Sequence, residues 1–213
     1  MTDLTVIVPG RNEEFMGRTV QDVLDNSQAQ IIVILDGYLP DPPLPVSDRV
    51  VVIYNPVAVG QRAAANQAAK IAKTKYLMKV DAHCAFDKDF DVKMIDAFKE
   101  VGDNVTMAPI MRNLHAFDWI CDEGHRRYQS PSGPCEKCGK PTTKDVVWIA
   151  KPSPQSYSFR FDKTMHFQYF GEYKSKQEGD LVETMSLQGS CFMITKEKWF
   201  ELDICSEEFH SWG

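Results

Sequence analysis

Long apolar runs are missing from this chain of 213 residues. A run such as Ile31–Leu35 is far too short to cross a bilayer, and the N-terminus lacks the basic start and apolar core of a signal peptide. An excess of positive charge is also missing. The formal net charge is −6, and no basic stripe offsets it, which argues against non-specific binding to nucleic acid. We therefore expect no transmembrane segment, no nucleic-acid partner and a cytoplasmic location.

Glycine is scarce in the turn that follows the first predicted strand. A Rossmann-type nicotinamide site needs three glycines there, because the backbone must approach a pyrophosphate closely, whereas Pro9–Glu14 contains only Gly10. The same turn is too short and too acidic for the glycine-rich basic loop expected of a nucleotidyltransferase. The sequence therefore disfavours a nicotinamide cofactor and leaves a nucleotidyltransferase as an alternative.

Strand and helix patterns alternate along the first half of the chain. Helical patterns follow the first, third and fourth predicted strands. They are marked by Val20, Val23 and Leu24, by the alanine-rich segment Gly60–Lys73, and by Met94, Ile95, Phe98 and Val101. Regular patterns resume with a strand at Leu187–Ile194 and a short helix at Lys196–Leu202. This alternation predicts an α/β fold with a mainly parallel sheet and helices on both faces. The predicted strands of the first half are Leu4–Val8, Ile31–Leu35, Val50–Tyr54, Tyr76–Val80 and Val105–Ile110.

Residues 112–180 interrupt this alternation, because they are rich in His, Cys, Pro, Gly and Lys and show no sustained period. We expect an insertion made of loops and short strands, with a small hairpin formed by Ser156–Phe161 and His166–Phe170. The whole chain, residues 1–213, is then a single domain that carries this insertion.

Asp81 and His83 come directly after the buried strand pattern of Tyr76–Val80. Side chains two residues apart along a strand point the same way. Both are therefore expected to converge beyond the carboxyl end of the strand, where open α/β sheets bind ligands. One carboxylate and one imidazole supply half of a divalent-metal site. The alternative is a surface Asp and a loop His, each hydrogen-bonded locally.

Two further positions at element ends are candidates for ligand contacts. Asp36 ends the second predicted strand, where its carboxylate could accept hydrogen bonds from a ribose or a base, or serve in the turn before Gly37. Gly60 and Arg62 begin the alanine-rich helix, where backbone N–H groups favour anions and the guanidinium adds donors. The alternative for this helix start is a solvated end without a ligand.

The insertion holds four side chains whose spacing suggests a metal centre: Cys121, His125, Cys135 and Cys138 are spaced C-x3-H-x9-C-x2-C. The C-x2-C pair has the form of a zinc knuckle, in which two thiolates bind one tetrahedral Zn²⁺. Four ligands leave no open position, so this zinc would be structural. A redox C-x-x-C pair and simple buried thiols are the alternatives.

Several of these segments, read in order, match a known pattern: Val6–Glu13, Val33–Asp36, Gly60–Arg62 with Asn66, and Val80–Cys84. Together they resemble the nucleotide-sugar-binding half of family-two-like glycosyltransferases of the GT-A fold. The D-x-H form of the metal motif is similar to that of the polypeptide N-acetylgalactosaminyltransferases. The resemblance covers residues 4–110 and 187–213.

The resemblance implies roles for individual residues. Asp81 would reach the ribose and the metal, His83 would ligate the metal, and Gly189 would lie beside the transferred sugar. An imidazole ligand favours Mn²⁺, because Mg²⁺ prefers an all-oxygen octahedron. The residues implied at the nucleotide sugar are Pro9, Arg11, Glu13, Asp36, Gly60, Arg62, Asp81 and Gly189.

These expectations combine into a glycosyltransferase of the hexosyltransferase type. It would move a sugar from a nucleotide-diphosphate donor, UDP-linked, to an unidentified acceptor with the help of Mn²⁺. The alternatives are a catalytically degenerate, zinc-stapled module that only binds a nucleotide sugar, and a nucleotidyltransferase. An assay of nucleoside-diphosphate release with and without Mn²⁺ separates them.

The acidic pair Glu207 and Glu208 is the candidate catalytic base in this chain, because a paired carboxylate can have a raised pKa. Both are equally interpretable as solvated charges before an aromatic residue. Relatives continue past a similar Trp-Gly to further acidic residues, and a later metal-ligating His is absent unless His210 substitutes. We therefore expect a catalytically incomplete chain.

Overall fold

A computed structural model describes residues 2–154, 159–172, 178–184 and 189–209. The chain divides into two compact units, each with a sheet of its own. The larger unit comprises Met1–Pro109 and Ser158–Gly213, and the smaller comprises Ile110–Tyr157.

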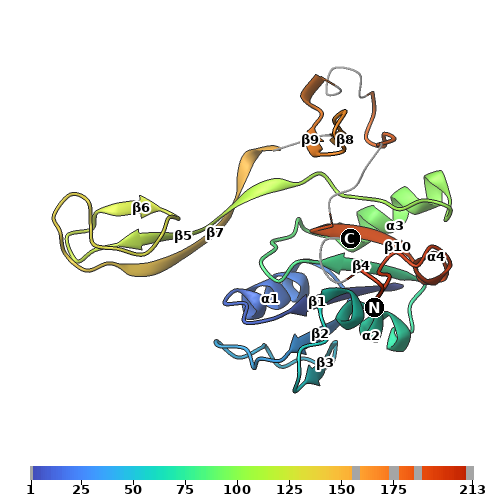
Figure 1. Ribbon diagram of the computed structural model, residues 1–213, viewed down its shortest axis with the longest axis horizontal. Coiled ribbons are helices and arrows are strands. Elements are labelled where there is room, and N and C mark those ends of the chain that lie inside the picture. Colours follow the sequence, from blue (N-terminus) through green and yellow to red (C-terminus); the bar gives the residue numbers. More distant parts are fainter. Residues whose placement is uncertain (1, 155–158, 173–177, 185–188, 210–213) are drawn as a thin grey trace. The chain divides into compact units, whose positions relative to one another are not determined.

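Five strands form the sheet of the larger unit, in the order β10-β4-β1-β2-β3 (Figure 1). β1 pairs in parallel with β2 and β4, and β2 pairs in parallel with β3, whereas β10 runs antiparallel to β4. The predicted α/β fold with a mainly parallel sheet is therefore confirmed. The strands are β1 (Leu4–Gly10), β2 (Gln30–Asp36), β3 (Val50–Asn55), β4 (Tyr76–Val80) and β10 (Cys191–Thr195).

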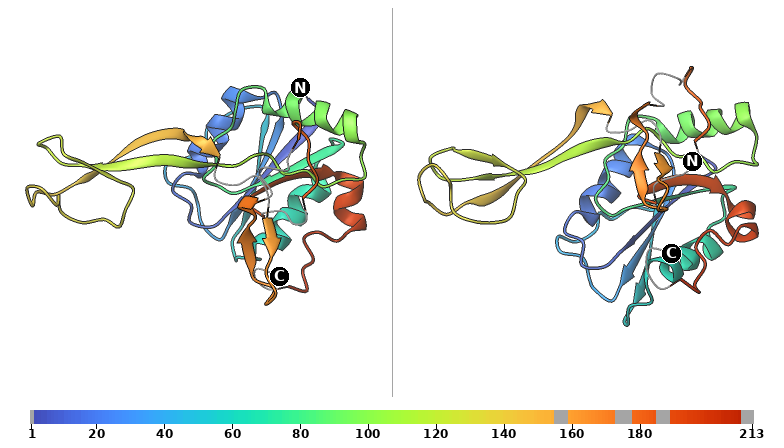
Figure 2. Two further views of the ribbon diagram at one scale, coloured as in Figure 1. Left: turned by 90° about the horizontal axis from the view of Figure 1, so that it is seen from above. Right: turned by 45° about the horizontal axis from the view of Figure 1, so that its top comes forward.

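Helices cover both faces of this sheet, as predicted (Figure 2). Because successive strand residues point to opposite faces, Val6 packs in one core and Ile7 in the other. The first core takes residues from α1 (Met16–Asn26) and α3 (Phe90–Val101). The second takes them from α2 (Gln61–Ile71) and α4 (Lys196–Glu201). The face that α2 turns to the sheet consists of four buried alanines: Ala64, Ala65, Ala68 and Ala69.

The fifth strand of the sheet differs from the prediction. Val105–Ile110 is not a strand, because only Met107 pairs with the sheet, through an isolated bridge to Met193. The two backbone N–H groups donate to the opposite carbonyls over 2.8 and 2.7 Å. Pro109 has no N–H and cannot extend this pairing. The strand predicted at Leu187–Ile194 supplies the edge instead as β10, and residues 187 and 188 lie outside the described residues.

The smaller unit is a three-stranded antiparallel sheet in the order β6-β5-β7. Its strands are β5 (Arg112–Ile120), β6 (Arg126–Tyr128) and β7 (Thr143–Pro154). The prediction of only loops and short strands was wrong here, since β5 has nine residues and β7 has twelve. The register shifts between Arg112 and Leu114 and again between His115 and Phe117. Such bulges interrupt the alternation of side chains, so no period of two is visible in the sequence.

Two short strands follow in the larger unit, β8 (Phe159–Phe161) and β9 (Phe167–Tyr169), which pair as the predicted hairpin. The first residues predicted for it, 156–158, lie outside the described residues. In the part of the chain that the structure describes, no helix has both the length and the apolar character that crossing a bilayer requires.

Candidate functional site

The carboxyl ends of β1, β2 and β4 carry most of the residues predicted to bind a nucleotide. β1 lies between its parallel neighbours β2 and β4, so the strand order reverses at this point. A reversal of this kind opens a crevice at the carboxyl edge of a parallel sheet. Asp36 is the last residue of β2, Asp81 follows β4, and Arg11 and Glu13 follow β1.

Asp81 is held by a lysine that the sequence reasoning missed. The Nζ atom of Lys79 lies 2.5 Å from Oδ1 of Asp81 and donates to the carbonyl of Gly189 over 2.7 Å. The Asp81 N–H donates to the Ser190 carbonyl over 2.8 Å, which ties the end of β4 to the start of β10. The side chain of Lys79 is 7% exposed and that of Asp81 is 27% exposed. In the sequence, the only sign of this role is that Lys79 is a single charged residue inside the apolar run of β4.

His83 lies beside Glu13, with its Nδ1 atom 3.5 Å from Oε2 of the carboxylate. Ala82 is buried between Asp81 and His83, and the imidazole is half-exposed. Within the described residues, no third carboxylate, thiolate or imidazole joins these groups in a closed cluster. A carboxylate and an imidazole are ligands that Mn²⁺ accepts, and Asp81 and His83 are the residues that would hold it here.

Asp36 uses both of its carboxylate oxygens inside the protein. Oδ1 accepts from the Val59 N–H over 2.8 Å and from Asn55 Nδ2 over 3.3 Å, while Oδ2 accepts from the Gly60 N–H over 2.9 Å. Asp36 is buried, and Gly60 has a φ of +92°, where any other residue would be strained. The geometry makes Asp36 the anchor of the loop that leads into α2. Direct contact between Asp36 and a nucleotide stays a prediction.

An exposed aromatic ring stands next to the first predicted contact. The Arg11 guanidinium lies over the ring of Tyr38, with Cζ 5.6 Å from the centroid, and 46% of Tyr38 is exposed. A planar cation and an accessible ring at the carboxyl edge suit a nucleobase, which has a face for stacking. Tyr38 was not among the predicted residues, because its only signal in the sequence is an aromatic residue after Gly37, the glycine that follows β2.

The C-terminal segment packs on α2 and carries the candidate base. Arg62 donates to the Ile204 carbonyl over 3.4 Å and lies over the ring of Phe209. Nδ2 of Asn66 donates to Oε1 of Glu207 over 3.0 Å, and its Oδ1 accepts from the buried indole of Trp199 over 2.9 Å. Glu207 and Glu208 line a pocket of about 510 Å³ on this surface. His210 and Gln188 lie outside the described residues.

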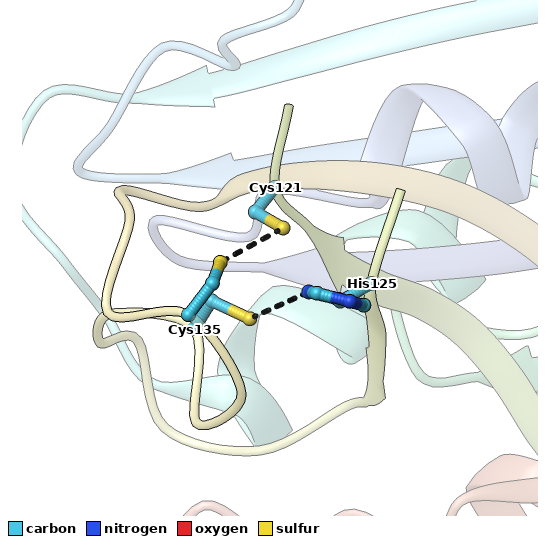
Figure 3. Close-up of side chains that lie close together, drawn as sticks. Cys121, His125 and Cys135 are labelled. Carbon is cyan, nitrogen blue, oxygen red and sulfur yellow. Dashed lines mark hydrogen bonds between the residues drawn. The ribbon is translucent and has the colours of Figure 1, made fainter. Parts of the chain in front are cut away.

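The predicted zinc ligands come together within the smaller unit. Cys121 follows β5, His125 precedes β6, and Cys135 and Cys138 lie in the loop before β7. Their four ligand atoms all lie within 4.8 Å of one another. Figure 3 shows Cys121, His125 and Cys135 pointing toward a common centre.

Two of the separations between these atoms match tetrahedral zinc. The sulfurs of Cys121 and Cys138 are 3.7 Å apart, and the Cys135 sulfur is 3.6 Å from Nδ1 of His125. Zinc bond lengths of 2.0–2.3 Å place neighbouring ligands about 3.5–3.8 Å apart. These residues therefore fit zinc in both chemistry and spacing.

Electrostatics distinguish Cys135 from the other cysteines, whereas burial and the neighbouring Cys135 and Cys121 raise the pKa of Cys138 in the same cluster. Backbone N–H groups, first that of Lys137 and then that of Cys138, lower the pKa of Cys135 to about 6. Burial raises the pKa of Cys84 to about 11 and also raises that of Cys191. Thiolates bind metal and neutral thiols do not. Cys135 therefore presents a thiolate ligand, whereas half-buried Cys84 and buried Cys191 keep their thiol protons.

Comparisons with known proteins agree with this architecture. Residues 5–198 match glycosyl transferase family 2. No curated protein matches the chain. The crystal structure of GalNAc-T7 with UDP, GalNAc and Mn²⁺ matches 99% of this chain at 17% identity, with a TM-score of 0.64, and the match spans 38% of that longer chain. The crystal structure of S. aureus TarS matches 46% of this chain and 19% of its own length at 17% identity, with a TM-score of 0.38.

Proposed function

Since the chain belongs to glycosyl transferase family 2 and is a glycosyltransferase domain of GT-A fold, we propose that it moves a hexose from a UDP-linked donor with the help of Mn²⁺. The observation that carries this proposal is the placement of Asp81 and His83 at the carboxyl edge of the sheet, where the strand order reverses. The similar structure of GalNAc-T7, which contains UDP and Mn²⁺, supports the choice of nucleotide and metal.

In this proposal Asp81 and His83 would hold the metal, which would supply positive charge to stabilise the leaving diphosphate. Arg11 and Tyr38 take the base and ribose at the end of β1. Asp36 keeps Gly60 and the start of α2 in place, where backbone N–H groups favour an anion. Gly189, fixed through its carbonyl by Lys79, leaves room for the sugar.

Glu207 is the proposed base for the acceptor, which is unidentified. Asn66 holds one carboxylate oxygen, and the buried indole of Trp199 fixes Asn66 in turn. Glu208 lines the same pocket and is the alternative. A base must be positioned before its pKa matters, and this chain of hydrogen bonds positions Glu207.

The smaller unit is proposed to hold one structural Zn²⁺ through Cys121, His125, Cys135 and Cys138. The spacing of the ligand atoms and the lowered pKa of Cys135 support zinc. Because the ligand set is closed, this metal would stabilise the fold and take no part in transfer.

The nucleotide and the first metal are tested together by calorimetry. The protein is dialysed free of divalent cations without chelators, since EDTA would also strip a zinc centre. UDP, GDP, CDP and dTDP are then titrated with and without Mn²⁺. We expect UDP to bind tightest and to need Mn²⁺, and a nucleotide affinity indifferent to Mn²⁺ would contradict the metal assignment. UDP release from UDP-hexoses then distinguishes a transferase from a module that only binds.

A further inference from the structure

We propose that Lys79 makes metal binding at Asp81 conditional on the nucleotide diphosphate. The inference rests on the proposed nucleotide and metal site and assigns a positioning role to a residue outside that ligand set. Lys79 is the one charged residue of β4, and the strand is buried along its whole length.

Lys79 restricts how Asp81 can bind a metal. Its Nζ atom lies 2.5 Å from Oδ1 of Asp81, so that oxygen already accepts a charge-assisted hydrogen bond. A cation is therefore expected to bind Asp81 through Oδ2, the oxygen farther from the ammonium. The second bond of Lys79, to the Gly189 carbonyl over 2.7 Å, prevents the ammonium from swinging away.

Because Lys79 is buried, its positive charge interacts strongly with nearby charges. The side chain is 7% exposed, so water screens it poorly, whereas Asp81 and His83 are open to solvent at 27% and 56%. A cation bound to Oδ2 would lie on the far side of the same carboxylate and would be repelled by the ammonium. A lysine is tolerated in this position because Asp81 and the Gly189 carbonyl satisfy it.

The charges around the crevice leave little to attract a free divalent cation. The Asp81 and Glu13 carboxylates are partly offset by Lys79, and His83 adds no charge when neutral. Among Asp81, Glu13 and Lys79 one net negative charge remains, and Arg11 at the same edge of the sheet adds a positive charge. A diphosphate brings the missing negative charge and oxygen ligands, so the metal is expected to enter with the nucleotide.

The test measures Mn²⁺ binding directly, without any transfer assay. The electron paramagnetic resonance signal of free Mn²⁺ gives the dissociation constant with and without saturating UDP. The variants are Lys79→Met, which removes the charge, and Lys79→Arg, which keeps it. Lys99→Met is the matched control, because Lys99 pairs with Asp96 on the surface of α3.

For the unaltered chain we expect UDP to tighten Mn²⁺ binding at least tenfold. Lys79→Met should bind Mn²⁺ without nucleotide about tenfold more tightly, and the effect of UDP should shrink by the same factor. Lys79→Arg and Lys99→Met should keep the full effect of UDP. Coupling between two ligands is reciprocal. Mn²⁺ must therefore tighten UDP binding by the same factor by which UDP tightens Mn²⁺ binding, in the unaltered chain and in each variant.

Two outcomes would overturn the proposal. One is a Lys79→Met protein, folded by circular dichroism, whose affinity for Mn²⁺ without nucleotide is unchanged or weaker. The other is an unaltered chain that binds Mn²⁺ equally well with and without UDP, which decides the matter even if the variant does not fold. An absence of any UDP binding would instead count against the proposed function, while the Mn²⁺ titration of Lys79→Met without nucleotide would still test the role of Lys79.

Discussion

The two compact units bury apolar surface to very different extents. The larger unit has one hydrophobic core on each face of its sheet. Among the described residues of the smaller unit, only Cys121, Cys135 and Trp148 are buried apolar residues, and two of them are candidate zinc ligands. The proposed zinc would therefore give the smaller unit the stabilisation that apolar burial gives the larger one.

The two proposed metal sites differ in the same way. The pair Asp81 and His83 is open and depends on a bound ligand to complete it, whereas the four ligands of the smaller unit close around one point. A closed set stabilises a fold and an open set leaves room for a reacting group. Removing either metal should therefore have separate consequences in the two units.

Loss of zinc should produce the largest effect. Zinc binding supplies folding free energy of roughly 10 kcal/mol or more in small metal-dependent units. Cys138→Ser should lower the zinc content, expected at one ion per chain by elemental analysis. Amide hydrogen exchange should lose its protection across residues 112–150, while residues 4–80 stay protected.

Cys205→Ser is the matched control for that variant, because Cys205 is a half-buried thiol of the larger unit. It should keep both the zinc and the exchange pattern. Protein prepared without chelators that holds well under one zinc per chain would refute the zinc assignment.

The converse change removes a core side chain from the larger unit. Trp199 is 1% exposed and stacks on Phe192 with centroids 5.7 Å apart, so Trp199→Ala should cost about 3–5 kcal/mol. Chemical denaturation followed by exchange at residues 4–80 measures the loss, and zinc content should not change. Phe200→Ala, at a 44% exposed position of the same helix, should cost much less. A loss of zinc in Trp199→Ala would show that the two units do not fold separately.

A smaller effect is expected at the open metal site, where function changes without stability. His83→Ala should weaken Mn²⁺-dependent UDP binding by about tenfold, the lower end for loss of an interaction that supports a metal site. The thermal midpoint should shift little, since the imidazole is half-exposed. His166→Ala, in the β8–β9 hairpin, is the control for calorimetry. Equal UDP affinities in the two variants would remove His83 from the site.

The smallest effect on binding is expected at the proposed base. Glu207→Gln keeps the oxygen that accepts from Asn66, so the free energy of unfolding should change little. The dissociation constant for UDP should change by less than about twofold. Any hexose transfer by the chain should fall to background, as followed by UDP release with a panel of acceptors. If Glu208→Gln abolishes transfer and Glu207→Gln does not, the assignment of the base moves by one residue.

Local signals in the sequence determined the elements that depend on local physics. Apolar runs, alanine content and turn residues predicted β1 to β4, the first three helices and α4. The spacing of Cys121, His125, Cys135 and Cys138 predicted the cluster, because ligand geometry constrains short loops. The position of Asp81 and His83 after a strand predicted their place at the sheet edge.

Tertiary structure decided what depends on partners far apart in the chain. Val105–Ile110 has the composition of a strand, yet the edge of the sheet is taken by β10, about eighty residues later. Asp36 looks free to contact a ligand until the loop at Val59 and Gly60 occupies its oxygens. From the sequence alone, Lys79 could be a charge that points to solvent. In the structure its ammonium is buried and donates hydrogen bonds to Asp81 and to the Gly189 carbonyl. Propensity and periodicity act over a few residues, whereas a buried charge or a sheet edge is defined by whichever distant group satisfies its hydrogen bonds.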